Sequence, residues 1–181
     1  MGGRPVTRTP ARSFVFAEER EGALAAMAAV RAAGQGWVNV QPVVEPEDEP
    51  PRPGILAIFG GSPHRVPMAT WLPAPVAAGR RAGATTVGVL HATGPRLAPR
   101  LAGAGVGMPA GWRVTQDHLR RGLVVEVVIG SDDASVLSWI VAVLGHVCAV
   151  RSTGRFRATV YGPASRGPLP GDPASTEAPD V

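Results

Sequence analysis

Asp117 and His118 are adjacent in the sequence and are followed shortly by Arg120 and Arg121. A histidine titrates near neutral pH, a neighbouring carboxylate can orient it or act as a base, and a guanidinium stabilises developing negative charge. His91, at the end of an apolar segment, is a third titratable candidate. We interpret His91, Asp117 and His118 as the candidate catalytic residues of an enzyme that moves a proton on an anionic substrate. The alternative is that an exposed Asp-His pair at a turn is structural.

A second group of residues favours anion binding without catalysis. Thr93 precedes an expected helix start, where unpaired N–H groups and the positive end of the helix dipole attract negative charge. Arg96, Arg120 and Arg121 carry planar guanidinium groups that match phosphate and carboxylate. We therefore expect Thr93, Arg96, Arg120 and Arg121 to form an anion-binding or partner-binding site. The alternative is that the two adjacent arginines only solvate a hairpin tip and that Thr93 only caps a helix.

No motif identifies a metal or a cofactor. His64, His91, Asp117 and His118 are scattered, without the close pairing that is usual for metal ligands. Residues 60–65, Gly-Gly-Ser-Pro-His-Arg, follow an apolar segment but lack the spacing of a phosphate-binding loop or a dinucleotide-binding turn. We therefore expect neither a metal nor a cofactor.

The elements that would position these residues follow in the order strand, helix, strand, strand, helix, strand, which is that of a ferredoxin-like βαββαβ unit. They are expected at 86–91, 95–106, 112–117, 122–129, 133–147 and 155–161. Pro95 suits a first helical position, and Asp132 with Asp133 suits a helix cap. The first and second strands of such a unit run in the same direction, so their carboxyl ends share one edge. The residues expected to converge there are His91, Thr93, Arg96, Asp117, His118, Arg120, Arg121, His146, Arg151 and Arg155.

The preceding half is expected to add strands and one helix. These elements are strands at 13–17, 37–44, 54–60 and 65–72 and a helix from Glu18 to Gly34 or Gly36. Pro42 argues that its strand lies at a sheet edge. The pairs Gly36-Trp37 and Gly111-Trp112 occupy the same place in two strand-helix-strand segments, which leaves a weak internal duplication open. The predicted fold class is α+β, with a largely antiparallel sheet and helices on one face.

Composition favours a single domain at 13–162, with halves at 13–72 and 86–162. Pro and charge predict disordered tails at 1–12 and 163–181 and a mobile loop at 45–53. All 18 basic residues are Arg, which is typical of a GC-rich bacterial genome, and the net charge is +4. The single cysteine, Cys148, excludes an internal disulfide and favours a cytoplasmic location. No membrane span is expected, because polar residues interrupt the longest apolar run.

Two classes of function follow from these residues. The preferred one is a non-catalytic binding or protein-interaction module whose basic edge accepts an anionic small molecule or a protein partner. The alternative is the small enzyme described above, and a homo-oligomeric assembly subunit is a third reading. The strands at 86–91 and 122–129 carry Val, Leu and Ile in place of stacking aromatics, which argues against nucleic acid binding. A concave pocket at the edge would favour the enzyme, and a flat edge would favour the module.

Overall fold

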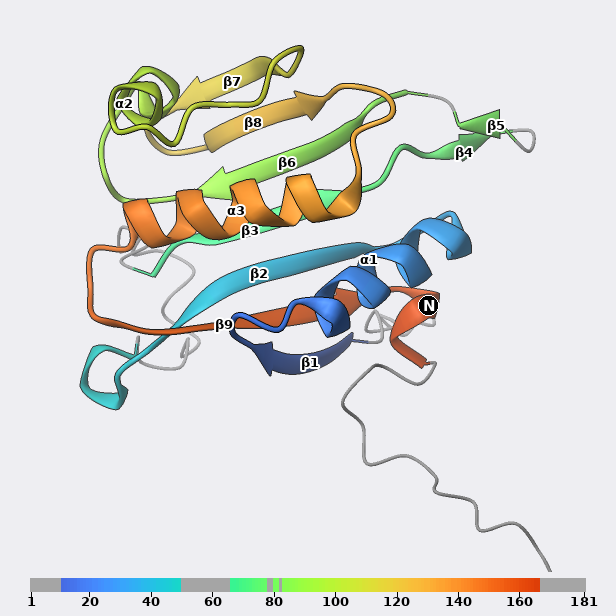
Figure 1. Cartoon of the computed structure of the whole chain (residues 1–181), viewed down its shortest axis with the longest axis horizontal. Coiled ribbons are helices and arrows are strands. Elements are labelled where there is room, and N and C mark those ends of the chain that lie inside the picture. The colour runs from blue at the N-terminus through green and yellow to red at the C-terminus, as the bar shows by residue number, and fades with distance from the viewer. Residues whose placement is uncertain (1–10, 50–65, 78–79, 82, 167–181) are drawn as a thin grey trace, which may run out of the picture.

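The computed structural model describes residues 11–49, 66–77, 80–81 and 83–166 (Figure 1). The helices are α1 (Glu21–Ala33), α2 (Leu97–Gly103) and α3 (Asp133–Val147), with short 3-10 turns η1 (Pro46–Asp48) and η3 (Pro163–Arg166). The main sheet contains β1 (Ala11–Phe16), β2 (Trp37–Val44), β3 (Met68–Leu72), β6 (Thr85–Leu90), β7 (Arg113–His118), β8 (Gly122–Val127) and β9 (Ser152–Tyr161). A separate small hairpin pairs β4 (Val76–Ala77) with β5 (Arg80–Arg81).

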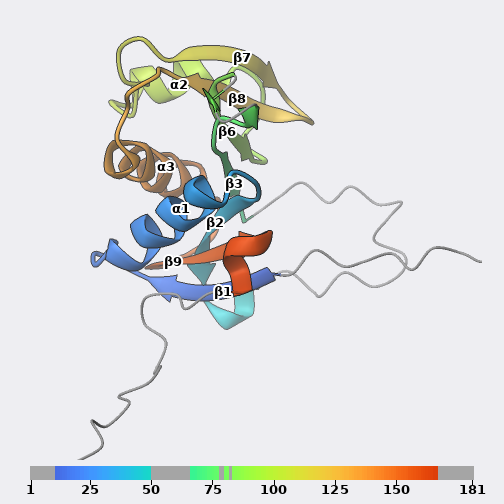
Figure 2. The same ribbon diagram turned by 90° about the vertical axis from the view of Figure 1, so that its right-hand side faces the viewer.

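The seven strands of the main sheet are arranged in the order β1-β9-β2-β3-β6-β8-β7. Every neighbouring pair is antiparallel. Figure 2 shows α1 and α3 against one face of this sheet, with α2 on the same side near β7. The predicted α+β class with an antiparallel sheet and helices on one face is therefore confirmed.

The ferredoxin-like unit is not confirmed. The three adjacent strands β6, β8 and β7 have the expected order, but a ferredoxin-like unit would also place β9 beside β6. Instead β9 lies between β1 and β2, and α3, which packs against β3 and β2, connects β8 to β9 (Figure 1). The physical reason is that β1 and β2 run in the same direction with a one-strand gap between them, and β9 satisfies the backbone groups on both sides of it.

The internal duplication is not confirmed either. In the second half, the strand after the βαβ segment, β8, inserts between β6 and β7. In the first half, the corresponding strand, β3, pairs on the outer side of β2 and joins it to β6. The two halves therefore have similar local elements but different strand pairing.

Pro42 does not mark an edge strand, because β2 lies between β9 and β3. It is tolerated there for a local reason. The pairing of β2 with β3 covers only Val38 to Val40, so Pro42 lies past its end and is opposite Phe156 of β9 alone. A proline that lacks an N–H therefore leaves no β3 carbonyl without its partner.

The core lies between the sheet and the helices. Fully buried Trp71, Val87 and Leu123 come from three adjacent strands, and Leu137 and Ile140 of α3 are buried among the same cluster. The predicted cap of α3 is confirmed, since Asp132 Oδ1 accepts the Ser135 N–H at 2.7 Å. This hydrogen bond lowers the pKa of the Asp132 carboxyl.

Several predicted boundaries move. Residues 11 and 12 belong to β1 and not to a tail, and Pro163–Arg166 forms η3. The predicted strand at 54–60, the 60–65 loop and the outer parts of both tails lie outside the described residues. Within the described part of the chain, no helix has the length and apolar character needed to cross a membrane.

The core predicts a matched pair of substitutions in which only burial differs. Ile140 is fully buried, whereas Ile129 in the β8–α3 turn is 90% exposed. Ile140→Ala should lower the free energy of unfolding by about 2 to 5 kcal/mol because it removes buried methyl groups and leaves a cavity. Ile129→Ala should change it by less than about 0.5 kcal/mol. Chemical denaturation measures both, and equal effects would contradict this packing.

Candidate functional site

A bulge in β7 decides which way Asp117 points. Val114 is opposite the buried Val125, but the register shifts at Thr115, so that Gln116 is opposite Val124 and Asp117 is opposite the buried Leu123. Without the extra residue, strict alternation would place Asp117 on the face away from the helices. The bulge therefore turns the Asp117 carboxylate toward α2.

Asp117 caps the start of α2. Its Oδ1 accepts the Leu97 N–H at 3.0 Å, and its Oδ2 accepts the Ala98 N–H at 2.9 Å. The residue before the helix, Arg96, has a left-handed backbone (φ 55°) and makes no cap of its own, so the carboxylate from β7 replaces a local cap. These two amides are not available to an external anion, contrary to the expectation that this helix start would offer unpaired N–H groups.

His118 holds the β7–β8 turn. Its Nδ1 accepts the backbone N–H of Arg120 at 3.1 Å and that of Arg121 at 3.3 Å, so neutral His118 carries its proton on Nε2. Gln116 Nε2 donates to the Arg121 carbonyl at 2.9 Å from the other side. Gly122 closes the turn with φ 78°, and a Cβ there would lie 2.2 Å from the Val89 carbonyl oxygen. The turn that carries the two arginines is therefore fixed by side chains.

His91 is buried next to this site, with only 4% of its surface exposed. Its Nδ1 is 3.1 Å from the Thr93 hydroxyl, and its Nε2 has no hydrogen-bond partner among the described residues. Burial lowers the pKa of His91 below the ordinary value of 6.5; the nearby Asp117 charge raises it and the Arg100 charge lowers it further. The imidazole is therefore held neutral at physiological pH, and the Thr93 hydroxyl is engaged by it.

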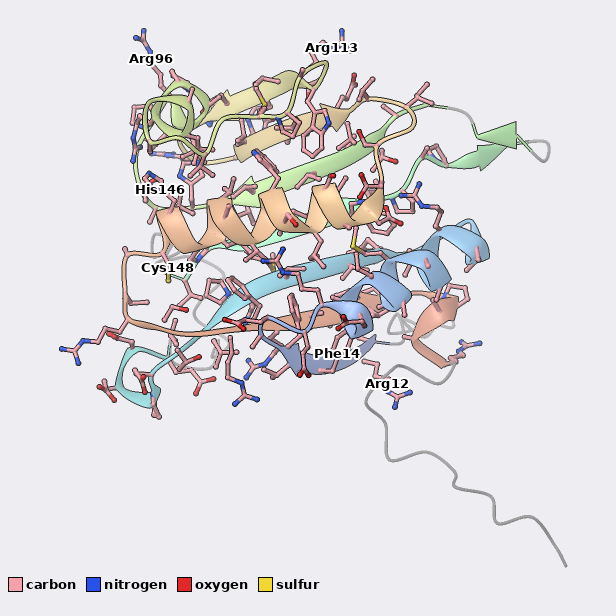
Figure 3. The ribbon with its side chains drawn as sticks, viewed as in Figure 1. Arg12, Phe14, Arg96, Arg113, His146 and Cys148 are labelled. Carbon is pink, nitrogen blue, oxygen red and sulfur yellow. The ribbon has the colours of Figure 1, made fainter. Side chains whose placement is uncertain are left out.

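Arg96, Arg120 and Arg121 are exposed, and we call these three residues the arginine edge. Within the described residues none of them forms an ion pair with a carboxylate, whereas Arg113 on the same sheet pairs with Glu126. Figure 3 shows Arg96 projecting outward from the start of α2. The arginine edge therefore presents positive charge without a carboxylate partner among the described residues. Asp117 and His118 of β7 hold in place the two segments that carry it, the start of α2 and the β7–β8 turn.

The expected convergence of ten residues is only partly correct. His146, in the last turn of α3, lies at the same end of the molecule as α2 (Figure 3). Arg151 and Arg155 belong to the opposite half, because β9 pairs with β1 and β2. The Arg151 N–H donates to Asp48 at 3.4 Å, and Arg155 lines a groove at the end of β1.

One residue of the site was missed by sequence reasoning. Arg100 donates from its guanidinium to the Thr93 carbonyl and so ties α2 to the segment before it. The available signal was its position four residues after Arg96 in the predicted helix.

The described residues contain no group of three or more His, Cys, Asp or Glu side chains that could hold a metal ion. The two cavities described lie elsewhere. One, of about 390 Å³, lies at the start of α3, and the other is the groove at the end of β1. Neither is lined by His91, Asp117 or His118.

Comparison of the chain with protein-family models, with curated proteins and with solved structures finds no match. The function of this edge must therefore be inferred from the geometry described above.

The capping role of Asp117 predicts a stability effect. Asp117→Asn retains the shape but replaces one acceptor oxygen by a donor that faces an amide of α2. Unfolding should become easier by about 1 to 2 kcal/mol, as for the loss of a helix cap. Glu126→Gln, at a carboxylate whose partner is the exposed Arg113, should cost less than about 1 kcal/mol. Equal stability of Asp117→Asn and wild type in urea denaturation would exclude the cap.

The buried His91 predicts a pH dependence of stability. The unfolded chain binds a proton at this residue as pH falls through about 6.5, whereas the folded chain resists protonation until lower pH. The free energy of unfolding should therefore fall as pH drops below about 6.5, and His91→Asn should make this fall shallower. As a control, Ile140→Val should lower stability by a similar amount at every pH. Parallel pH profiles for His91→Asn and wild type would contradict the assignment.

Proposed function

We propose that this chain is a non-catalytic binding module whose arginine edge accepts an anionic partner. The observation that supports this most is that Asp117 and His118 each hold one part of the arginine edge in place. Asp117 accepts hydrogen bonds from the segment that follows Arg96, and His118 accepts hydrogen bonds from the turn that carries Arg120 and Arg121. The three guanidinium groups thus extend from fixed backbone, and they have no carboxylate partner within the described residues.

Fixed backbone favours binding because less conformational freedom is lost when the complex forms. Guanidinium groups also bind carboxylates through two parallel hydrogen bonds, which a lysine ammonium cannot do. Arg96 adds a further indication. A left-handed backbone is unfavourable for a long side chain such as that of arginine, so a glycine would fit this position better unless the side chain is needed.

The favoured partner is an acidic segment of another protein. Neither described cavity is lined by the arginine edge, and exposed side chains outside a pocket suit a macromolecular surface better than a small ligand. Carboxylates of such a segment match the three guanidinium groups. A cytoplasmic location is part of this proposal, supported by the free Cys148, whose thiol is within 3.4 Å of the Val150 carbonyl.

The enzyme alternative has less support. Asp117 uses both carboxylate oxygens as a cap, His118 uses Nδ1 to hold a turn, and His91 is buried with its pKa lowered by desolvation. A general base needs access to the proton that it removes. The three candidates instead have partners within the chain that account for their positions.

A peptide titration monitored by nuclear magnetic resonance tests whether the arginine edge binds an anionic partner. The probe is a short oligoglutamate peptide, with inorganic pyrophosphate in a separate arm to represent small anions. Oligoglutamate should shift the amide signals of residues 93–98 and 118–122 and bind more weakly as salt is added. The double variant Arg120→Ala, Arg121→Ala should lose about 1.5 to 3 kcal/mol for each charge-assisted hydrogen bond removed.

The matched control is Arg151→Ala with Arg155→Ala, which removes two exposed arginines from the other half of the sheet. It should bind the peptide as wild type does. Undiminished affinity in the Arg120, Arg121 double variant would refute the arginine edge, as would an equal loss in the control. If pyrophosphate binds at residues 93–122 and the peptide does not, the proposed protein partner is wrong and the ligand is a small anion.

A further inference from the structure

His91 is a buried titratable group that the proposed binding does not use. Only 4% of its surface is exposed, and its Nε2 has no hydrogen-bond partner among the described residues. Most buried polar atoms in folded proteins have a partner, so this nitrogen needs an explanation. A neutral imidazole places an uncharged ring there, whereas a protonated one would bury a positive charge and an unpaired Nε2–H. The buried position therefore favours the neutral form of His91.

Side-chain contacts hold the segment that follows His91 in place. His91 Nδ1 is 3.1 Å from the Thr93 hydroxyl, and Arg100 donates to the Thr93 carbonyl. Asp117 accepts the first two amide N–H groups of α2. Arg96 lies between these contacts and has an unfavourable left-handed backbone (φ 55°). Because α2 has seven residues and packs on β7, residues 91–98 can leave these contacts while the sheet stays paired.

We infer that His91 is a proton-sensitive switch for the start of α2. With neutral His91 the segment of residues 91–98 keeps its contacts, which is the closed state, and protonation of the ring favours an open state in which these contacts are lost. In the open state Arg96 no longer extends from fixed backbone, so the proton on His91 decides whether the arginine edge is complete. The opening is measured in the free chain, so this inference does not depend on the proposed function.

The charges around His91 set the direction of the switch. Burial lowers the pKa of His91 below the ordinary value of 6.5, the Asp117 charge on β7 raises it, and the Arg100 charge on α2 lowers it. The other titratable side chains at this end of the molecule are His118 of β7 and His146 in the last turn of α3, and both are exposed. In the open state the ring is in water and takes up a proton as pH falls through about 6.5. Low pH therefore favours opening.

The start of α3 provides an internal control. It is also capped by a carboxylate, since Asp132 Oδ1 accepts the Ser135 N–H at 2.7 Å. Hydrogen bonds from Ser135 lower the pKa of Asp132, and this cap does not involve a histidine. The cap of α3 should therefore persist at a pH that opens the start of α2.

Amide hydrogen exchange of the full chain at about pH 7.5 and about pH 5.5 tests the switch, because these values lie on the two sides of histidine titration. After correction for the chemical exchange rate at each pH, the protection of the Leu97 and Ala98 amides should fall about threefold or more at the lower pH. Protection of the Ser135 amide should change by less than about twofold. His91→Asn should remove the pH dependence at Leu97 and Ala98.

The comparison between the two pH values keeps the test valid if His91→Asn loosens the segment, because protection should then be lower by the same factor at both. His146→Asn removes an exposed histidine at the same end of the molecule and should retain the wild-type pH dependence. Wild-type protection at Leu97 and Ala98 that does not change with pH would overturn the inference. So would an equal fall at Ser135, a fall that persists in His91→Asn, or a fall that His146→Asn abolishes.

Discussion

The structure depends on one arrangement, which is that the parallel strands β1 and β2 do not pair with each other. The helix α1 returns the chain in the same direction and leaves a one-strand gap, and β9 fills this gap by pairing antiparallel with both neighbours. Trp37 stacks on Tyr161 with centroids 4.8 Å apart where the strands meet. Gly36 is needed at the same place, because a Cβ there would lie 2.3 Å from the Tyr161 carbonyl oxygen. The last strand, β9, thus joins β1 and β2 into one continuous part of the sheet.

The position of β9 also separates two groups of arginines. Because β9 pairs in the first half, Arg151, which directly precedes it, and Arg155 within it lie far along the strand order from Arg120 and Arg121. The arginine edge is therefore built only from the β6–α2 segment and the β7–β8 turn. The bulge at Thr115 adds a second level of control, since it turns Asp117 toward α2 and leaves His118 to hold the turn.

Local patterns in the sequence were sufficient for most elements. The helices, the Asp132 cap and the strand order along the chain follow from periodicity and from residues that start or end a helix. The position of β9 could not be predicted in the same way. Its alternating pattern fits the side of β6 that β3 occupies as well as the gap between β1 and β2, and strand pairing is a non-local property. The sequence predicted that Asp117 and His118 end one strand and that His91 follows another, but it could not predict the contacts of Asp117, because a single bulge residue reverses which face Asp117 occupies.

The central claim is that Asp117 and His118 fix the two segments that carry the arginine edge. Amide hydrogen exchange measures this directly at the four N–H groups that these side chains accept, those of Leu97, Ala98, Arg120 and Arg121. The account predicts that all four exchange at least about tenfold more slowly than in an unstructured peptide of the same sequence. Exchange of these amides at the unstructured rate would contradict it.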